Sequence, residues 1–532
     1  MTALSSISAA QPLIVAKVVA NTTALDPVVE PAATDPLPSA IVTLGQDTGV
    51  SDTQVYSVRS LKADAEVPPA WEYTHQDKVT LAMQGNFITS SGVSRFQGLG
   101  ATLLTQLAET GKGISQSVMT SSSGKALAPA ELAAAQARLH SDAADNTISL
   151  TLKTASGKTV QLTLSGSENG LAVQAQVSGG DLSDDELTAL GKMADGFQSA
   201  IDGLTAKPPE LKLDALAQYD SRVFSSVGLS TRLKLADDSV QTLEMHADAD
   251  QRTVHLSGAS GELNLTVDLK NAAIIGNSDQ QAKALKSYVS QIEAARKRGD
   301  GDTQLLSMFE DAFTTLHSNY PGARESDGPQ TVNSMDLTDS DHSLLTGLAD
   351  FSASVTELPA ATNPARLGEL DTFSYDLSQA TQAKGRDPLN RSIVQDQQSN
   401  LVASYHKPLA AGQKLQLTTD PDSQNYAYYQ INDQASSKTS IGYEKGTLVK
   451  ASVSQSASQS THISTYVKGR LEEEKLIPVT SSKTRNLLTV LQQALQQDKA
   501  AKQGRGVSLL KDTLANIHDQ VLLQSDPSRL NG

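Results

Sequence analysis

The sequence has no cysteine in its 532 residues. Disulfide bonds, thiolate nucleophiles and cysteine-ligated zinc sites are therefore excluded. The same absence is typical of exported bacterial proteins that cross a secretion channel unfolded, and it also arises by neutral drift in the cytoplasm. Cysteine usage thus points toward export without excluding a cytoplasmic protein.

Aromatic residues are also scarce, with one Trp, 8 Phe and 12 Tyr. A chain of this length can still bury a core built from Leu, Val, Ile and Ala. The 43 basic residues are outnumbered by 59 acidic ones, which gives a net charge of −16 and argues against a nucleic-acid partner, because binding phosphates needs a clustered basic face. No apolar run is long enough for a transmembrane helix, and we expect no transmembrane segment.

The N-terminal residues lack the features of a secretory signal. No Lys or Arg precedes Lys17, and Lys17 interrupts the only apolar stretch, at 13–20, so we expect no cleavable signal peptide. Residues 1–40 are rich in Ala, Ser, Thr and Pro and cannot bury a core, which predicts a disordered leader that is dispensable for folding. Export would then need a dedicated apparatus.

Composition and periodicity divide the chain into six predicted segments. They are a disordered leader at 1–40, an N-terminal mixed region with helices at 41–144, a strand-plus-helix-pair module at 145–228, a second module at 229–320, a linker at 321–370 and a third module at 371–532. Within the mixed region, the run Lys78-Val79-Thr80-Leu81 predicts a strand. Helical spacing follows from Phe96 to Leu107, and a further helix is predicted from Pro129 through Leu139.

Each module is recognised by a change in the spacing of its apolar residues, from every second residue to every third or fourth. Alternating apolar residues predict strands at 148–152, 160–164 and 171–177 in the first module and at 229–235, 240–247, 253–256 and 263–269 in the second. Predicted helices follow, with apolar stripes at 187–201, 213–227, 285–292 and 305–316. The linker holds one short helix candidate at 344–351, and the third module has strands within 373–478 and helix stripes at 487–495 and 509–521.

These patterns predict an α+β fold of repeated antiparallel strand meanders, each followed by an amphipathic helix pair. Setting Ser183 against Ser278 aligns Leu190 with Leu285 and Ala194 with Val289. The alternative is that any two strand-then-helix segments align this well. In either case, strands joined by short turns pair antiparallel, and each helix pair covers one face of its own strands.

Catalytic motifs are missing or sit in the wrong context. Gly157-Lys158-Thr159 lacks the first glycine of a phosphate loop and falls between two strands, which predicts a plain turn. Ser122 and Lys125 have the Ser-x-x-Lys spacing of some acyl-transfer enzymes, but they lie in a Ser/Gly linker without the companion motifs. Gly111-x-Gly113 lies at a helix end and is no dinucleotide fingerprint. We therefore expect no catalytic residues and no cofactor.

Groups that could bind a metal depart from the known spacings. His246 and His255 fall on neighbouring strands and could face each other, but no third ligand is evident. Two acidic clusters depart from calcium-loop spacing and predict solvated loops. They are Asp336, Asp339 and Asp341, and Asp420, Asp422 and Asn425. We expect no metal.

Two further runs have simple structural interpretations. Glu472-Glu473-Glu474 predicts an exposed turn or strand end. Arg298-Gly299-Asp300 is a tripeptide that some cell-surface receptors bind, but here it predicts a helix stop followed by a helix start.

One run resembles uncharacterised bacterial proteins, some of them flagella-associated. The run Val177-Ser178-Gly179-Gly180-Asp181-Leu182-Ser183-Asp184-Asp185-Glu186-Leu187 is similar to a segment in which a strand turns into a helix through an acidic cap, and Asp77-Lys78-Val79-Thr80-Leu81 and the leader also look like parts of such proteins. The resemblance covers well under a fifth of the chain and carries no catalytic residues. It implies a bacterial origin and a surface or flagellar context.

Three functional hypotheses remain open. The first is a non-enzymatic modular binding or scaffolding protein, exported to the bacterial surface or medium, whose protein or surface partner is unknown. The second is a secreted hydrolase or toxin-like effector with a site assembled from residues distant in sequence. The third is a cytoplasmic assembly factor. A deep pocket gathering His, Asp and Ser would favour the enzyme, whereas a broad groove or exposed patch would favour binding.

Overall fold

A computed structural model describes residues 68–530 except 75, 122–124, 142, 236, 321–336, 388 and 411. The described residues belong to one compact unit, 65–532. The predicted leader and the first part of the mixed region lie outside them. Within the described ranges, no helix combines the length and the apolar composition that crossing a membrane requires.

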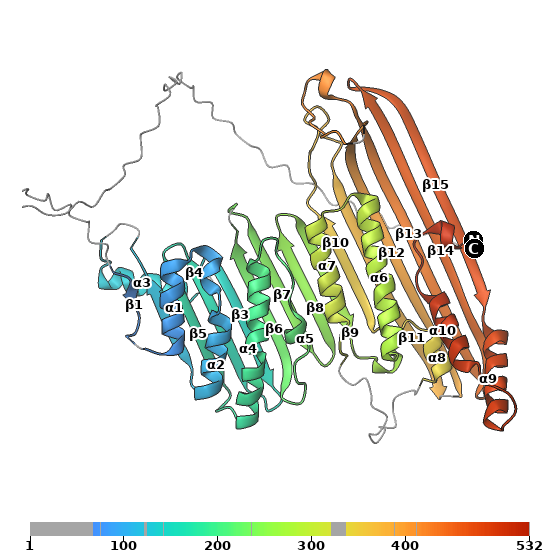
Figure 1. Cartoon of the computed structure of the whole chain (residues 1–532), viewed down its shortest axis with the longest axis horizontal. Coiled ribbons are helices and arrows are strands. Elements are labelled where there is room, and N and C mark those ends of the chain that lie inside the picture. The colour runs from blue at the N-terminus through green and yellow to red at the C-terminus, as the bar shows by residue number, and fades with distance from the viewer. Residues whose placement is uncertain are drawn as a thin grey trace, which may run out of the picture. The chain divides into compact units, whose positions relative to one another are not determined.

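The described residues form one fully antiparallel, 15-stranded sheet with helices packed on it, so the predicted α+β class with antiparallel pairing is confirmed (Figure 1). Its strands are β1 (Ala70–Trp71), β2 (Ile114–Met119), β3 (Asn146–Thr154), β4 (Thr159–Ser167), β5 (Gly170–Ser178), β6 (Phe224–Lys234), β7 (Val240–Asp248), β8 (Gln251–Gly258), β9 (Gly261–Asp268), β10 (Asp350–Glu357), β11 (Thr372–Asp387), β12 (Asn390–Pro408), β13 (Tyr426–Glu444), β14 (Thr447–Val467) and β15 (Arg470–Asn486).

The helices are distributed along the whole chain. They are α1 (Lys78–Thr89), α2 (Leu99–Thr110), α3 (Pro129–Leu139), α4 (Asp184–Thr205), α5 (Asp214–Ala217), α6 (Ser278–Gly299), α7 (Thr303–Leu316), α8 (Asp339–Ser343), α9 (Leu488–Lys502), α10 (Leu510–Val521) and α11 (Pro527–Leu530), with short 3₁₀ turns η1 (Gly92–Phe96), η2 (Ala272–Ile274) and η3 (Pro421–Ser423).

Strand order follows the chain except near the N-terminal edge. The order is β1-β2-β5-β4-β3-β6, and from β6 to β15 each strand pairs with the next one in sequence. Hairpin connections of this kind need only short turns, which is why the alternating segments of the sequence could be recognised. Strands β11 to β15 have 16 to 21 residues, whereas β3 to β10 have 8 to 11.

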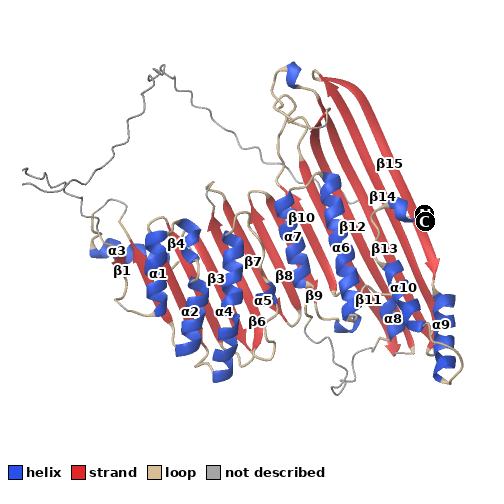
Figure 2. Ribbon diagram, viewed as in Figure 1, coloured by secondary structure: helices blue, strands red, loops and turns tan. Residues whose placement is uncertain are grey.

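Most helices lie on one face of the sheet (Figure 2). The main core joins this helix layer to the inward side chains of the strands, for example Leu150, Leu162 and Leu229 with Phe197 and Ile201. A second core packs Ile441 and Val453 against α9 and α10. We call the face of the sheet on which these helices pack the helix face, and we call the opposite surface the open face.

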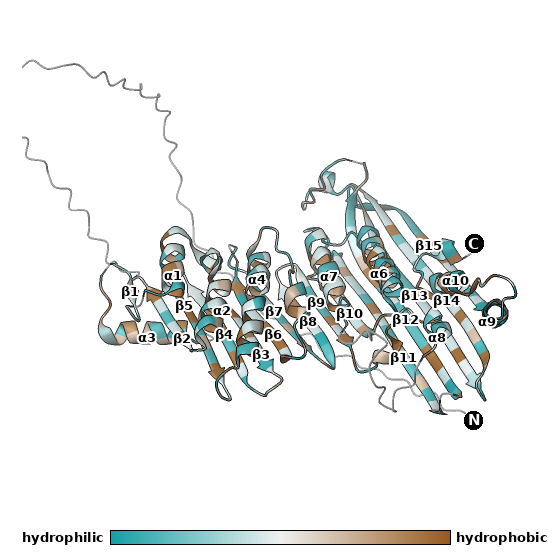
Figure 3. Cartoon of the chain, turned by 60° about the horizontal axis from the view of Figure 1, so that its bottom comes forward, coloured by the Kyte–Doolittle hydropathy of each residue, from teal (hydrophilic) through white to brown (hydrophobic). Residues whose placement is uncertain are grey.

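The open face consists of the alternate residues of each strand, because successive side chains point to opposite sides. Hydrophilic and hydrophobic residues alternate along the strands accordingly (Figure 3). Helix α3 covers the open face only near β2 and β5, where Leu139 packs on Met119 and Ala172. Loops at one end of the long strands also lie on this face, around His406, Tyr426 and Tyr428.

Four predictions of local structure are wrong. Residues 78–81 begin helix α1, because Asp77 accepts a hydrogen bond from Thr80 N at 2.7 Å and a stripe with four-residue spacing is buried. The helix predicted at 213–227 is not formed, because these residues contain only the single turn α5 and then the start of β6. Of the helix candidate at 344–351, residues 344–349 lie between α8 and β10 and 350–351 begin β10. Helix α6 is also rotated from the predicted phase, with Ala284, Tyr288 and Ile292 buried.

Helix α4 begins at a capping box that is tied to the sheet. Ser183 Oγ accepts from Glu186 N at 3.3 Å, and the Glu186 carboxylate accepts from Ser183 N at 2.7 Å. The same carboxylate accepts from Lys158 Nζ at 2.8 Å and Ser156 Oγ at 2.6 Å, in the β3–β4 turn. Burial alone would raise the pKa of Glu186, whereas the hydrogen bonds from Lys158 and Ser156 lower it to about 2.

Glu186→Gln is expected to lower the free energy of unfolding by about 2–3 kcal/mol at neutral pH, since it removes a largely buried charge pair. The folded-state pKa is depressed, so this stabilisation is present above pH 4.5 and is lost as the pH falls toward 2. Urea unfolding followed by circular dichroism measures the change. Asp185→Asn, one residue earlier and exposed, is the control, and an equal loss in both variants would contradict the prediction.

Candidate functional site

The structure accounts for the phosphate-loop-like tripeptide without a ligand. Gly157 lies in the turn that joins β3 to β4 and has φ +89°, a conformation that glycine adopts readily. Lys158 Nζ binds Glu186 at the start of α4. The predicted turn is therefore confirmed. Ser122 lies outside the described residues, so the interpretation of its spacing with Lys125 stays a prediction.

The two candidate histidines lie on the open face of β7 and β8 but are not opposite each other. His246 is opposite Thr253, and His255 is opposite Glu244. His246 Nε2 is 2.9 Å from Asp248 Oδ2, and His255 Nδ1 is 2.5 Å from an Asn264 oxygen. Among the described residues, no three His, Asp or Glu side chains gather closely enough to hold a metal ion.

The acidic candidates separate into different structural roles. Asp336 lies outside the described residues, Asp339 is the first residue of α8, and Asp341 is buried in an ion pair with Arg391. Asp420 caps the turn η3 by accepting from Asp422 N at 2.9 Å. The prediction of a solvated loop is therefore wrong for Asp341, whose side chain is 0% exposed.

The second acidic cluster and the glutamate run complete these assignments. Asn425 Nδ2 donates to the Asp422 carbonyl at 2.6 Å, and Lys468 Nζ lies 3.0 Å from the Asp422 carboxylate in an exposed pair. The run 472–474 is exposed and lies within β15 rather than in a turn.

The Arg-Gly-Asp tripeptide ends helix α6, as predicted. Asp300 takes the left-handed conformation, with φ 58° and ψ 36°, that closes the helix. The Arg298 guanidinium binds the Asp433 carboxylate on β13 and donates to Thr461 Oγ1 at 3.0 Å. A Cβ at Gly299 would lie 2.8 Å from the Phe373 ring. The tripeptide thus anchors α6 to the long strands.

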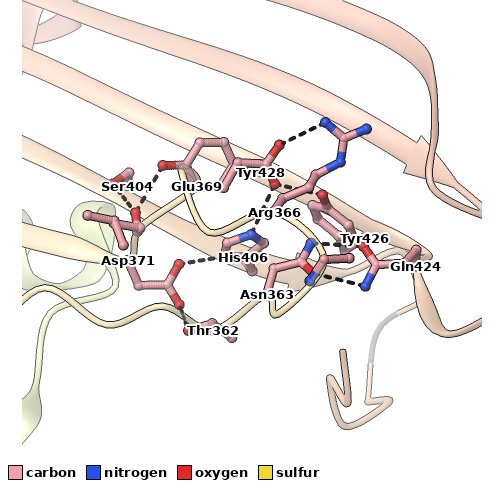
Figure 4. Close-up of polar contacts among 12 residues, drawn as sticks. Thr362, Asn363, Arg366, Glu369, Asp371, Ser404, His406, Gln424, Tyr426 and Tyr428 are labelled. Atoms are coloured by element: carbon pink, nitrogen blue, oxygen red, sulfur yellow. Dashed lines mark hydrogen bonds and ion pairs between the residues drawn. The ribbon is translucent and has the colours of Figure 1, made fainter. Parts of the chain in front are cut away.

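A polar network that no motif indicated lies at the end of the long strands (Figure 4). His406 Nδ1 is 2.5 Å from Asp371 Oδ1, and its Nε2 is 3.3 Å from Glu369 Oε2. Tyr426 donates to the same Glu369 oxygen at 2.6 Å. Burial, followed by this contact with Glu369, raises the pKa of Tyr426. A histidine between two carboxylates can serve in proton transfer when substrate can reach it.

Substrate cannot reach this network in the present arrangement. The His406 side chain is 0% exposed. The loops over it are fixed by a reciprocal amide pair between Asn363 and Gln424, at 2.8 and 2.9 Å, and by Tyr428, which donates to the Leu370 carbonyl at 2.9 Å. The network therefore fastens the loops before β11 and before β13 onto the open face. Its members are far apart in sequence, so no local spacing could have indicated it.

A groove of about 1750 Å³ runs between the start of α6 and α10. It includes His342, His518, Asp339 and Asp498. His518 Nε2 is 3.0 Å from the Thr346 carbonyl, and Ser508 donates to Asp498 at 2.7 Å. In the described residues, neither histidine hydrogen-bonds to a serine or a carboxylate of the groove. The arrangement required for an activated nucleophile is therefore not formed here.

His317 is a further buried titratable group, packed under β10. Its ring lies 4.5 Å from that of Phe313 and 5.0 Å from that of Phe351, between centroids, and its Nδ1 is 2.7 Å from Tyr320 Oη. Burial, and then the charge of Arg252, lower the pKa of His317 to about 3. The histidine is thus held neutral as part of the core.

His317 should make the protein sensitive to mild acid. Between pH 6.5 and 3 the His317 side chain is protonated in the unfolded chain but stays neutral in the folded chain. The free energy of unfolding therefore falls by about 1.4 kcal/mol per pH unit as the pH drops. Urea midpoints at pH 7 and pH 5 should differ less in His317→Gln than in the parent. His246→Gln, on the open face, is the control. An unchanged difference in His317→Gln would contradict the prediction.

The open face of β11 to β15 presents polar side chains on five neighbouring long strands. Cross-strand register forms two straight rows of side chains perpendicular to the strands. One row is Asp376, Asn400, Gln434, Ser458 and Thr480, and the other is Ser378, Gln398, Ser436, Ser456 and Ser482. All of these side chains except Ser482 line a shallow hollow of about 520 Å³. The arrangement can form many parallel hydrogen bonds to one extended ligand.

Comparisons with protein-family models, with curated proteins and with solved structures find no match for this chain.

Proposed function

We propose that the chain is a non-enzymatic binding or scaffolding protein and that it binds through the open face of β11 to β15. The observation that carries this proposal is the pair of polar rows, which are accessible and cross five strands. The buried carboxylate–histidine network is by contrast closed to substrate. A broad, shallow, polar surface favours an extended partner over a small molecule, which usually binds in a deep apolar pocket.

We further propose that the protein is exported to the bacterial surface or medium. The absence of cysteine, the leader composition and the resemblance to uncharacterised bacterial proteins, some of them flagella-associated, support this location. Fractionating the cells that make it into cytoplasm, envelope and medium tests the location. Finding the chain only in the cytoplasm would contradict export.

The absence of cysteine gives a direct test of the binding face. Ser436→Cys places a single thiol in the hollow, and Lys286→Cys places one on the exposed side of α6. Each variant is coupled to a bulky maleimide and mixed with the envelope fraction. Retention by the envelope should be lost only when position 436 is blocked. Equal retention of both labelled proteins would contradict a binding role for this face.

We also propose that the three strand-plus-helix segments are repeats of one structural unit. Support comes from the order of elements, since β3–β5 precede α4, β6–β9 precede α6 and α7, and β11–β15 precede α9 and α10, whereas β10 falls in the segment predicted as a linker. Repeated units open separately when their own contacts dominate. Native-state hydrogen exchange should then give distinct opening free energies for the three segments, and a single value throughout would contradict the repeat.

A further inference from the structure

We infer that the ligand of the open face is a neutral, hydroxyl-rich polysaccharide that lies across β11 to β15, along the two polar rows. This inference rests on the proposed function and adds the chemical class of the ligand. It follows from the hydrogen-bonding capacity, the spacing and the charge of the hollow, and each is argued separately.

The hollow offers donors and acceptors side by side. Asn400, Gln398 and Gln434 form no side-chain hydrogen bond to another described residue, and each amide can donate two hydrogen bonds and accept through its oxygen. The hydroxyl groups pair across strands, with Ser436 and Ser456 oxygens 2.8 Å apart. Hydroxyls engaged in this way retain further capacity. Sugar hydroxyls also donate and accept, so they complement this surface.

The spacing of the rows fits a polymer of sugars. Neighbours within one row are separated by the distance between strands, about 4.7–4.9 Å. That distance is close to the length of one pyranose residue in an extended glycan, so successive sugars would each meet a polar side chain on successive strands. An extended peptide in the same direction advances about 3.3 Å per residue and would lose this register.

The charge of the hollow disfavours an anionic polymer. Asp376 is the carboxylate among the lining residues, and these residues include no lysine or arginine. The nearby Lys438 Nζ is paired with the Asp396 carboxylate at 3.0 Å. The whole chain carries a net charge of −16. A nucleic acid or an acidic glycan would be repelled, whereas a neutral glycan would not.

The lining residues include no aromatic ring, so binding would depend on repeated hydrogen bonds rather than on stacking. Each such bond contributes little on its own. Affinity should therefore rise steeply with the length of the glycan, because later contacts form within an already bound chain.

Affinity electrophoresis of the full chain tests the inference, with hydroxyethylcellulose and dextran as neutral polymers and carboxymethylcellulose as the anionic one. At least one neutral polymer should retard the protein more than carboxymethylcellulose does, and cellobiose should not compete. Asn400→Ala/Gln434→Ala should weaken the retardation about tenfold. The control is Gln161→Ala/Gln176→Ala, a facing pair of exposed amides on the same face in β4 and β5, which should leave it unchanged.

The outcomes separate this inference from the proposed function. Retardation by neither neutral polymer, while envelope retention still depends on position 436, would overturn the ligand class alone. Retardation that is equal in the double variant and the parent would overturn the location. Failure of both the polymer and the envelope experiments would overturn the proposed function as well.

Discussion

Asp341→Ala is expected to destabilise the protein by about 3–5 kcal/mol, because it leaves a buried guanidinium without its carboxylate. The side chains of Arg391 and Asp341 are 5% and 0% exposed. Asp341 also accepts from Thr338 N at 2.8 Å, and the Arg391 guanidinium lies 4.3 Å from the centre of the Tyr443 ring. Urea unfolding followed by circular dichroism measures the loss.

Two further variants make this prediction specific to the charge pair. Asp339→Ala removes an exposed carboxylate two residues earlier on the same short helix and should cost well under about 1 kcal/mol. Asp341→Ala/Arg391→Met should recover part of the lost stability, since it removes the buried charge as well. If Arg391→Met lowered the free energy of unfolding of Asp341→Ala further, as a second independent substitution in the core would, the ion-pair explanation would be wrong.

Tyr288→Ala should cost about 3–5 kcal/mol, because it empties a large site between α6 and the sheet. Tyr288 is 1% exposed, and its ring meets those of Phe313 and Phe351 at centroid distances of 5.7 and 5.1 Å. Its hydroxyl donates to Gln397 Oε1 at 3.1 Å. Thermal and urea unfolding both report the change.

The matched variants for this site are Tyr288→Phe and Lys286→Ala. Tyr288→Phe keeps the ring and should cost only about 0.5–1.5 kcal/mol, because it loses one hydrogen bond while Gln397 Oε1 still accepts from Leu523 N at 2.9 Å. Lys286 is exposed on the same helix, so its replacement should have little effect. A loss for Lys286→Ala as large as that for Tyr288→Ala would show that the helix phase is wrong.

The strands were predictable from the sequence because their period is set by local alternation. Ile148, Leu150 and Leu152 all face the helix layer, and short turns fixed the antiparallel pairing. The helix α1 was missed because the four residues 78–81 fit both periods, and the signal that decides is the cap at Asp77 together with Met83 and Phe87. Local pattern is ambiguous when the apolar run is that short.

The open face could not be recognised as a site from the sequence. Ser, Thr, Gln and Asn at alternate strand positions are typical of any solvent-facing side. The feature that matters is cross-strand register, which aligns Asn400 with Gln434 and both with Thr480 in one row. Register depends on turn lengths and on the bulges in β13 and β14, and single-residue slips would exchange the two faces. Composition alone carries none of this.

Thiol labelling at two adjacent positions tests the central claim most directly. Ser436 lines the hollow, whereas its neighbour Ser437 is fully buried on the helix face and donates to the Val521 carbonyl at 2.8 Å. In the cysteine-free chain, Ser436→Cys should react rapidly with a maleimide and Ser437→Cys slowly, and the envelope fraction should slow the reaction at position 436. Equal rates at the two positions, or a rate at 436 that the envelope fraction leaves unchanged, would contradict an open face that binds.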